Sequence, residues 1–367
     1  MSDELFQPDW FSKPGDTLAA LMARRKLTLH AVAEKLKCDT VTVRGLLVGT
    51  VSVDEGMAVR LSHSVGGTPS FWRKRQSTYE TALARAADAV PKDKGAAWLQ
   101  KFPLNDIADY GWVNKPQLRA DVIKSYLAYF GVTGPHEWER RYTDFRNEVA
   151  FKTSPSFESK IGALSAWLRQ GEVEAATISC APWKPTLLRS RLADLRKLTK
   201  AKAPAYFIPQ LREICAAAGV AVVFVRAPAG CRASGATRFV SSDKAIVIVS
   251  FRYLSDDHFW FSFFHEVGHL ILHGKWSTFV DADATATSDK EIEANAFAAG
   301  VLVPRERHDE LVNLRARTEN VVRFAVSVGV SPGIVVGQLQ HLGVIGRNHL
   351  NFLKRRYDWA EITSAFA

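Results

Sequence analysis

The stretch His265-Glu266-Val267-Gly268-His269 is the most informative part of this sequence. Residues four apart on an α-helix share one face, so both imidazoles can bind one metal ion. Glu266 follows His265 by about 100° around the helix and can reach a water molecule beside that ion. Largely apolar residues flank the motif on both sides, which predicts a buried helix. Two imidazoles and a carboxylate are costly to bury unless a metal or another partner compensates them.

A third ligand is needed to make a metal site, and the segment from Glu291 to Pro304 supplies one. This segment predicts a helix that Pro304 ends. Glu291 lies within its apolar stripe, whereas Glu293 lies well outside it. We therefore predict Glu291 as the third ligand and Glu293 as a solvated neighbour. Asn295, one turn after Glu291, is placed to hydrogen-bond a ligating histidine and fix its tautomer.

Two histidines, one glutamate and an open position for water are typical of a catalytic zinc site. The residues leave one alternative open, a chance match in which a metal-free histidine pair packs in a core. One zinc ion per purified chain would exclude that alternative. His273 lies about 12 Å from His265 along a straight helix, too far to join the same metal. His258 and Arg238 are candidates for polarising a substrate carbonyl or binding a peptide.

Composition predicts packed domains in a reducing compartment. The chain has 367 residues, of which 47% are hydrophobic, enough for two or three domains. Its four cysteines show no metal-binding spacing and are expected to be reduced thiols. No signal-like or membrane-spanning run is evident, so we expect a cytoplasmic protein without a membrane partner. The net charge of +10 is compatible with nucleic-acid binding and equally with an ordinary solvated surface.

The amino-terminal segment predicts a helix-turn-helix. Helices are expected at about 17–25, 29–37, 40–48 and 53–64, with short polar residues at their starts. The third would lie in the DNA major groove, with Thr40, Thr42 and Arg44 outward and His30 at the start of the helix before it. A helical bundle that serves dimerisation is the competing interpretation. Because helix-turn-helix proteins commonly read two half-sites, a homodimer is expected.

These motifs also resemble known families. Residues 15–49, followed by Ser70-Phe71-Trp72, are similar to the Xre-type helix-turn-helix of HigA-like antitoxins. Residues 235–238 and 256–261, the H-E-x-x-H motif and the segment up to Pro304 resemble the ImmA/IrrE metallopeptidases.

The ImmA/IrrE resemblance implies a gluzincin-like core with His265, His269 and Glu291 as Zn²⁺ ligands and Glu266 as general base. Members of this kind cleave a repressor and so switch on a stress, phage or mobile-element response. Two positions depart from the patterns: His30 stands where glutamine is frequent, and Asn295 where aspartate is frequent.

We therefore predict a mainly α fold with a small β-sheet (α+β). A helix-turn-helix bundle at 1–88 and a helical connector at 89–200 precede a zincin-like metallopeptidase domain with C-terminal helices at 201–367. Runs of β-branched residues at 220–225 and 245–249 predict strands beside the metal helix, where an extended peptide could add to the sheet.

The predicted function is a zinc-dependent endopeptidase linked to a DNA-binding domain. It would regulate transcription in a stress, phage or toxin–antitoxin response by cleaving a repressor-like or antitoxin-like protein. The expected partners are operator DNA and that protein substrate. The alternative is a HigA-like DNA-binding antitoxin or repressor whose zincin domain senses or binds a partner without turnover.

Overall fold

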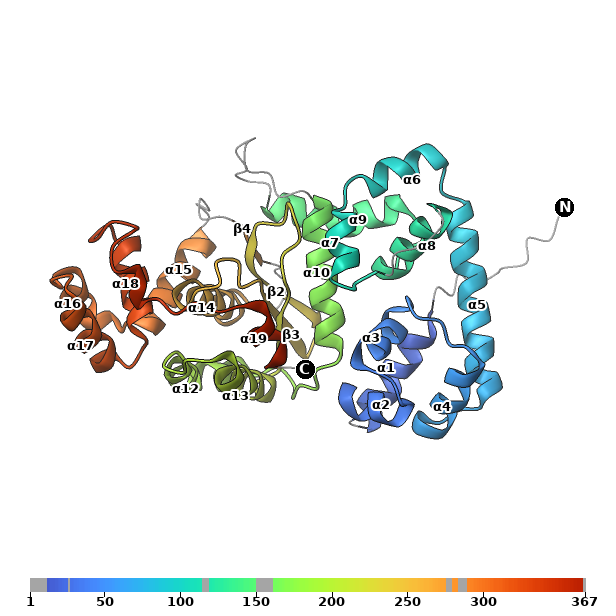
Figure 1. Ribbon diagram of the computed structural model, residues 1–367, viewed down its shortest axis with the longest axis horizontal. Helices are drawn as coiled ribbons and strands as arrows, with labels where there is room; N and C mark the ends of the chain where they lie inside the picture. The colour runs from blue at the N-terminus through green and yellow to red at the C-terminus, as the bar shows by residue number, and fades with distance from the viewer. Residues whose placement is uncertain are drawn as a thin grey trace. The chain divides into compact units, whose positions relative to one another are not determined.

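The computed structural model describes residues 12–25, 27–113, 119–149, 161–274, 279–282 and 289–365. Contacts divide the chain into two compact units (Figure 1). The helical unit comprises residues 1–146, 160–179 and 228–230, and the sheet unit comprises residues 147–159, 180–227 and 231–367. Most of the segment expected to be a connector groups with the amino-terminal helices. The division into three domains stays a prediction.

The described part of the helical unit is built from helices alone. They are α1 (Pro14–Arg25), α2 (Leu29–Leu36), α3 (Thr40–Val48), α4 (Glu55–Val65), α5 (Pro69–Asp88), α6 (Lys92–Leu99), α7 (Leu104–Asp109), α8 (Arg119–Phe130), α9 (Pro135–Val149) and α10 (Ile161–Ala176).

Capping residues set the bounds of α2 and α3. The side chains of Thr28 and Asp39 accept hydrogen bonds from backbone N–H groups of the first turns of α2 and α3. Gly49 ends α3 in the left-handed conformation, at φ 87°, which a residue without a Cβ adopts freely. Residues 37–39 form the short connection between the two helices, as the sequence predicted. The core of this pair consists of buried apolar residues: Val32, Leu36, Val43, Leu46 and Leu47.

The sheet unit surrounds a mixed four-stranded sheet. Its elements are α11 (Pro185–Ser190), α12 (Leu192–Leu198), α13 (Pro204–Ala217), β1 (Val220–Phe224), β2 (Ala233–Ser241), β3 (Lys244–Val249), α14 (Asp256–His273), β4 (Phe279–Ala282), α15 (Asp289–Leu302), α16 (His308–Val312), α17 (Thr318–Val328), α18 (Pro332–His341) and α19 (Trp359–Ser364). The strand order is β1-β3-β2-β4. Strands β1 and β3 are parallel, and β2 is antiparallel to both β3 and β4.

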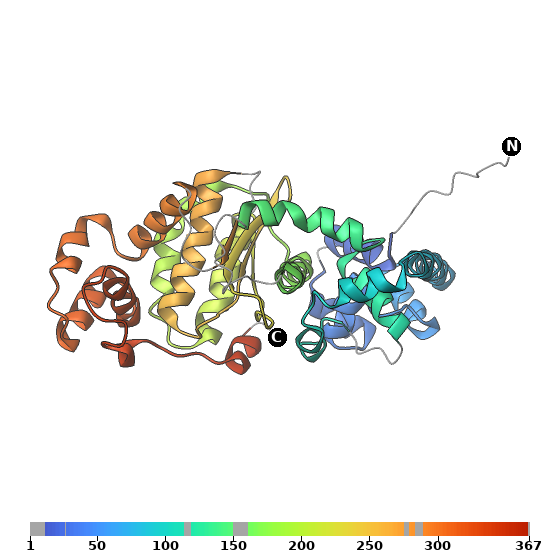
Figure 2. The same ribbon diagram turned by 90° about the horizontal axis from the view of Figure 1, so that it is seen from above.

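The core of the sheet unit lies between the sheet and its helices. Strands β1 and β3 are rich in β-branched residues and almost entirely buried, which is typical of strands covered on both faces. Helices α13 and α14 pack against the sheet, and α15 and α18 pack against α14 (Figures 1 and 2). The predicted fold class, mainly α with a small sheet, is confirmed. Strands β2 and β4 were not predicted.

Among the described helices, none is by itself long and apolar enough to cross a membrane. Helices α17 and α18 meet that criterion by length and composition only as a pair, which is bent by 107°.

Candidate metal centre

Helix α14 holds both histidines of the motif in the interior of the sheet unit. Its aromatic side chains Phe259, Trp260 and Phe263 are at most 2% exposed and belong to one core with strands β1 and β3. This packing fixes the rotation of the helix about its axis. As a result His265 and His269 share one buried face, with 2% and 1% of their surface exposed.

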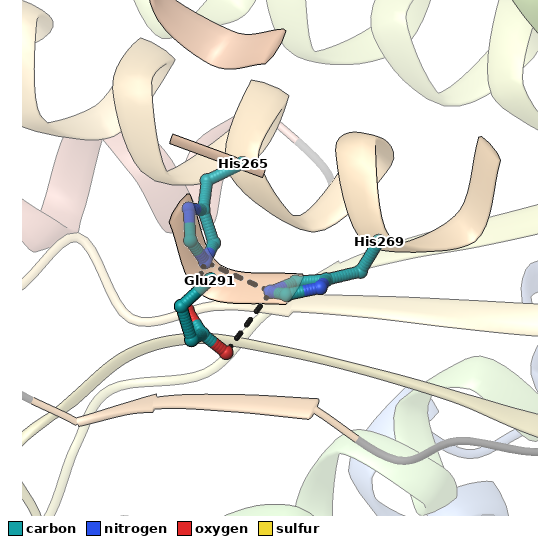
Figure 3. Close-up of side chains that lie close together, drawn as sticks. All are labelled: His265, His269 and Glu291. Atoms are coloured by element: carbon teal, nitrogen blue, oxygen red, sulfur yellow. Dashed lines mark hydrogen bonds and ion pairs between the residues drawn. The ribbon is translucent and has the colours of Figure 1, made fainter. Parts of the chain in front are cut away.

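The three predicted ligands lie together in the structure (Figure 3). Nε2 of His265 is 2.9 Å from Nε2 of His269. The carboxylate of Glu291, on α15, places Oε2 3.0 Å from Nε2 of His265 and Oε1 3.3 Å from Nε2 of His269. Atoms bound about 2.0–2.1 Å from a tetrahedral zinc ion are separated by about 3.3 Å, so this donor set fits zinc. No fourth His, Cys, Asp or Glu of the described residues joins the group.

Asn295 is positioned to select the tautomer of His265. Its Oδ1 lies 2.9 Å from Nδ1 of His265. When Nδ1–H donates to this oxygen, Nε2 of His265 presents a lone pair toward Glu291. Two acceptors 3.0 Å apart repel unless a cation lies between them. A shared metal ion therefore satisfies all three ligand atoms at once.

The electrostatics of the site favour the protonation states that bind metal. Burial lowers the pKa of His269 to about 4, so its imidazole is neutral at neutral pH. Burial alone would raise the pKa of Glu291, but hydrogen bonds that the two imidazoles donate in the absence of a cation outweigh it and hold this pKa at about 2. Metal ligation requires neutral histidine and ionised carboxylate, which is the combination found here.

The neighbouring candidates lie outside the three-ligand group. Glu293 is 61% exposed, with a carboxylate oxygen 3.7 Å from Nδ1 of His273. Nε2 of His273 lies 3.1 Å from the backbone carbonyl oxygen of Lys290. His273 therefore connects the end of α14 to the start of α15.

The two glutamates of α15 make a matched test of the metal site. Loss of a residue that only contacts a metal ligand typically weakens metal binding by roughly 10–100-fold. Because Glu291 would bind the metal directly, we expect Glu291→Gln to weaken zinc binding by more than that. Glu293→Gln should leave zinc binding unchanged, because that side chain faces solvent. Competition with a chromogenic chelator measures both affinities. Equal affinities in the two variants would remove Glu291 from the site.

Gly235 on β2 is a feature of the site that the sequence did not reveal. Glu266 is fully buried, and a Cβ added at Gly235 would lie 2.5 Å from its Oε1 and 2.7 Å from its Cγ. The carboxylate thus lies directly against the backbone of β2. A glycine at residue 235 is required for this close approach.

A cleft of about 280 Å³ adjoins the metal centre and includes His265 and Glu291 in its lining. His258 also lines it, with its ring 4.2 Å from that of Tyr253, and burial lowers the pKa of this histidine. His258 thus lines the same cleft as the metal centre, and its role toward a substrate stays a prediction. Arg238, the other candidate, is half-buried on β2 and is not part of the cleft lining.

The residues predicted to contact DNA lie in the helical unit, on α2 and α3. His30 is exposed, and Thr40, Thr42 and Arg44 are partly buried. Nε of Arg44 lies 2.9 Å from Oε2 of Glu174 on α10, with the side chains 22% and 18% exposed. The only basic side chain of α3 is therefore paired with a carboxylate of the same chain, which competes with DNA phosphate.

The grouping of His265, His269 and Glu291 is the arrangement expected for H-E-x-x-H metallohydrolases with a glutamate as third ligand. Residues 217–339 match the family model Peptidase_M78, the IrrE N-terminal-like domain. This range contains Glu266 and all three candidate ligands, and it supports the ImmA/IrrE resemblance for the sheet unit. Residues 1–216 lie outside the match, so the Xre-like resemblance stays a prediction. A search of curated proteins finds no match.

Proposed function

We propose that this chain is a zinc-dependent endopeptidase that cleaves a repressor-like or antitoxin-like protein. The observation that carries the proposal is the convergence of His265, His269 and Glu291 on one point beside a cleft. The match to a peptidase family over the same residues supports it.

The roles of the residues follow from general zinc-hydrolase chemistry. A zinc ion held by His265, His269 and Glu291 would supply Lewis acidity for the scissile carbonyl and for the attacking water. Glu266 takes the proton from the attacking water and passes it to the leaving amine. Burial of Glu266 against Gly235 holds the carboxylate in one place, so this proton transfer needs little reorganisation.

Incubation with candidate substrates tests the proposal directly. Zinc-loaded protein is mixed with the proteins encoded beside it, and intact masses are followed over time. We expect one of them to be cut at a single peptide bond, with protein stripped by a chelator as the inactive control. If zinc-loaded protein cuts none of these proteins and no peptide library, the peptidase proposal is wrong.

A Gly235→Ala substitution should impair the reaction without removing the metal. The added methyl group displaces the Glu266 carboxylate, and a displacement of about 1 Å costs roughly 100-fold in rate. Zinc content should stay at one ion per chain. Val240→Ala is the control, since Val240 lies on the same strand and is 44% exposed. An undiminished cleavage rate in Gly235→Ala would show that the position of Glu266 does not matter.

We also propose that the helical unit binds operator DNA through α3 as a homodimer in the cytoplasm. The α2–α3 pair with its short connection supports this proposal, and the Arg44–Glu174 ion pair opposes tight binding. Gel-shift assays should therefore show weaker binding for Arg44→Ala and stronger binding for Glu174→Gln. Unchanged binding in both variants would remove α3 from DNA contact. Operator binding without proteolysis would favour the alternative, a repressor or antitoxin whose zincin unit binds a partner without turnover.

A further inference from the structure

The cleft beside the metal centre has room for a substrate side chain. Its volume of about 280 Å³ lies just below the range of roughly 300–1,000 Å³ of small-molecule sites. Three residues of the metal centre, His265, Glu291 and Asn295, form part of its lining. A group anchored on the metal therefore has its neighbouring substituent in this cleft.

The walls of the cleft are largely apolar. Phe261, Leu302 and Ile334 line it from α14, α15 and α18, and Tyr253 adds an aromatic ring. Leu302 and Ile334 are each 1% exposed, so they are anchored in the core of the sheet unit. The ring of Phe261 lies 6.3 Å from the ring of His265, which brings the apolar wall next to a metal ligand.

Apart from the metal centre and two histidines, His258 and His341, the described lining of the cleft offers no charge without a counter-charge. Outside the metal centre, the described lining contains one carboxylate, that of Asp257. Its Oδ2 lies 2.6 Å from Nζ of Lys354, and its Oδ1 accepts a hydrogen bond of 2.7 Å from Ser255. A charged substrate side chain would lose its hydration here without gaining an ion-pair partner.

Two arginines, Arg252 and Arg356, donate to backbone groups at or near the lining residue Tyr253. Nη1 of Arg356 donates to the carbonyl oxygen of Tyr253, and Nη1 of Arg252 donates to that of Arg232. Neither arginine is part of the cleft lining.

We propose that this cleft selects an uncharged apolar side chain, of the size of leucine or phenylalanine, next to the scissile peptide bond. The inference rests on the proposed peptidase function and names the substrate class of the same site. Transfer of such a side chain from water into the cleft favours binding by about 10-fold or more. Lysine or aspartate gains nothing comparable and loses hydration.

Amino-acid hydroxamates test the selectivity without requiring turnover. The hydroxamate group binds zinc, and the attached side chain occupies the adjoining cleft. Dissociation constants of N-acetylated leucine, phenylalanine, lysine and aspartate hydroxamates are measured by calorimetry with the zinc-loaded full-length chain. We expect the leucine and phenylalanine compounds to bind at least about 10-fold more tightly than the other two.

A charge introduced at the cleft should change this order. His341 lines the cleft and is exposed, so His341→Glu adds a carboxylate to the lining without disturbing the core. We expect it to improve binding of the lysine compound relative to the leucine compound by about 5-fold. Val326→Glu adds the same charge at a site 72% exposed on α17, outside the cleft lining, and should leave the ratio unchanged.

The outcomes separate this inference from the proposed function. Equal binding of apolar and charged compounds by zinc-loaded protein overturns the selectivity alone. Tighter binding of the aspartate compound also overturns it, because the cleft would then favour an anionic side chain. A chain that binds no zinc refutes the metal centre, and both proposals fail with it.

Discussion

Glu266→Gln is expected to retain one zinc ion per chain and to lose about 10²–10⁴-fold in cleavage rate. The amide has nearly the same shape as the carboxylate, so the buried space against Gly235 stays filled. It cannot accept a proton from water at neutral pH, so general base catalysis is lost. The three ligand atoms belong to other residues, and the metal should therefore remain bound. Cleavage rates and zinc content are measured on the same preparation.

The control for this variant is a second Glu→Gln change with the same loss of charge. Glu293 is 61% exposed on α15, so Glu293→Gln should cleave at the wild-type rate. Full activity in Glu266→Gln would remove Glu266 from the mechanism. Loss of zinc in that variant would instead show that Glu266 acts on the stability of the metal site.

The metal centre could be predicted because helical periodicity determines which residues share a face. His265 and His269 are four residues apart, and Glu291 has the helical spacing that places it on the same face as the buried positions of its own helix. The local sequence therefore determines on which face of its helix each candidate ligand lies. The contact of Asn295 with His265 followed from the same periodicity, since Asn295 lies one turn after Glu291.

Strand β2 could not be predicted in the same way. It runs Ala-Ser-Gly-Ala-Thr-Arg-Phe-Val-Ser from Ala233 to Ser241, and small residues of low β-propensity fill its first half. Packing explains the glycine among them, because Gly235 leaves space for the Glu266 carboxylate. Only the tertiary structure shows which side chain needs that space.

Long-range ion pairs were equally inaccessible to sequence patterns. Arg44 reads as an outward basic residue on a helix that contacts DNA, yet Glu174 on α10 lies 2.9 Å from it. The basic run Lys354-Arg355-Arg356 likewise gives no sign in the sequence of a buried partner. In the structure Lys354 is paired with Asp257, and the backbone N–H of Arg355 donates to Asp256.

These contacts join the carboxyl-terminal segment to the start of the metal helix. Asp256 and Asp257 are the first two residues of α14, and both are buried. Asp256 accepts a 2.6 Å hydrogen bond from Ser331, which precedes α18, and a 3.0 Å bond from the N–H of Arg355. Asp257 is held by Lys354. The position of α14, and with it the metal ligands, thus depends on residues far away in the sequence.

Lys354→Met is accordingly expected to destabilise the sheet unit by about 3–5 kcal/mol. The side chains of Lys354 and Asp257 are 7% and 6% exposed, so removal of the ammonium group leaves a buried carboxylate without its counter-charge. Methionine keeps most of the side-chain length, which limits the contribution of a cavity. Denaturant unfolding of zinc-loaded protein measures the change.

Two further variants make this result specific to the ion pair. Lys197 pairs with Asp194 at the surface, with side chains 70% and 40% exposed, so Lys197→Met should leave the free energy of unfolding nearly unchanged. The double variant Asp257→Leu with Lys354→Met removes both charges and should recover much of the lost stability, because no unpaired ion remains buried. If the double variant is as unstable as Lys354→Met, packing around residue 354 rather than the charge on Asp257 accounts for the loss. The Lys354–Asp257 contact would then position α14 by shape alone.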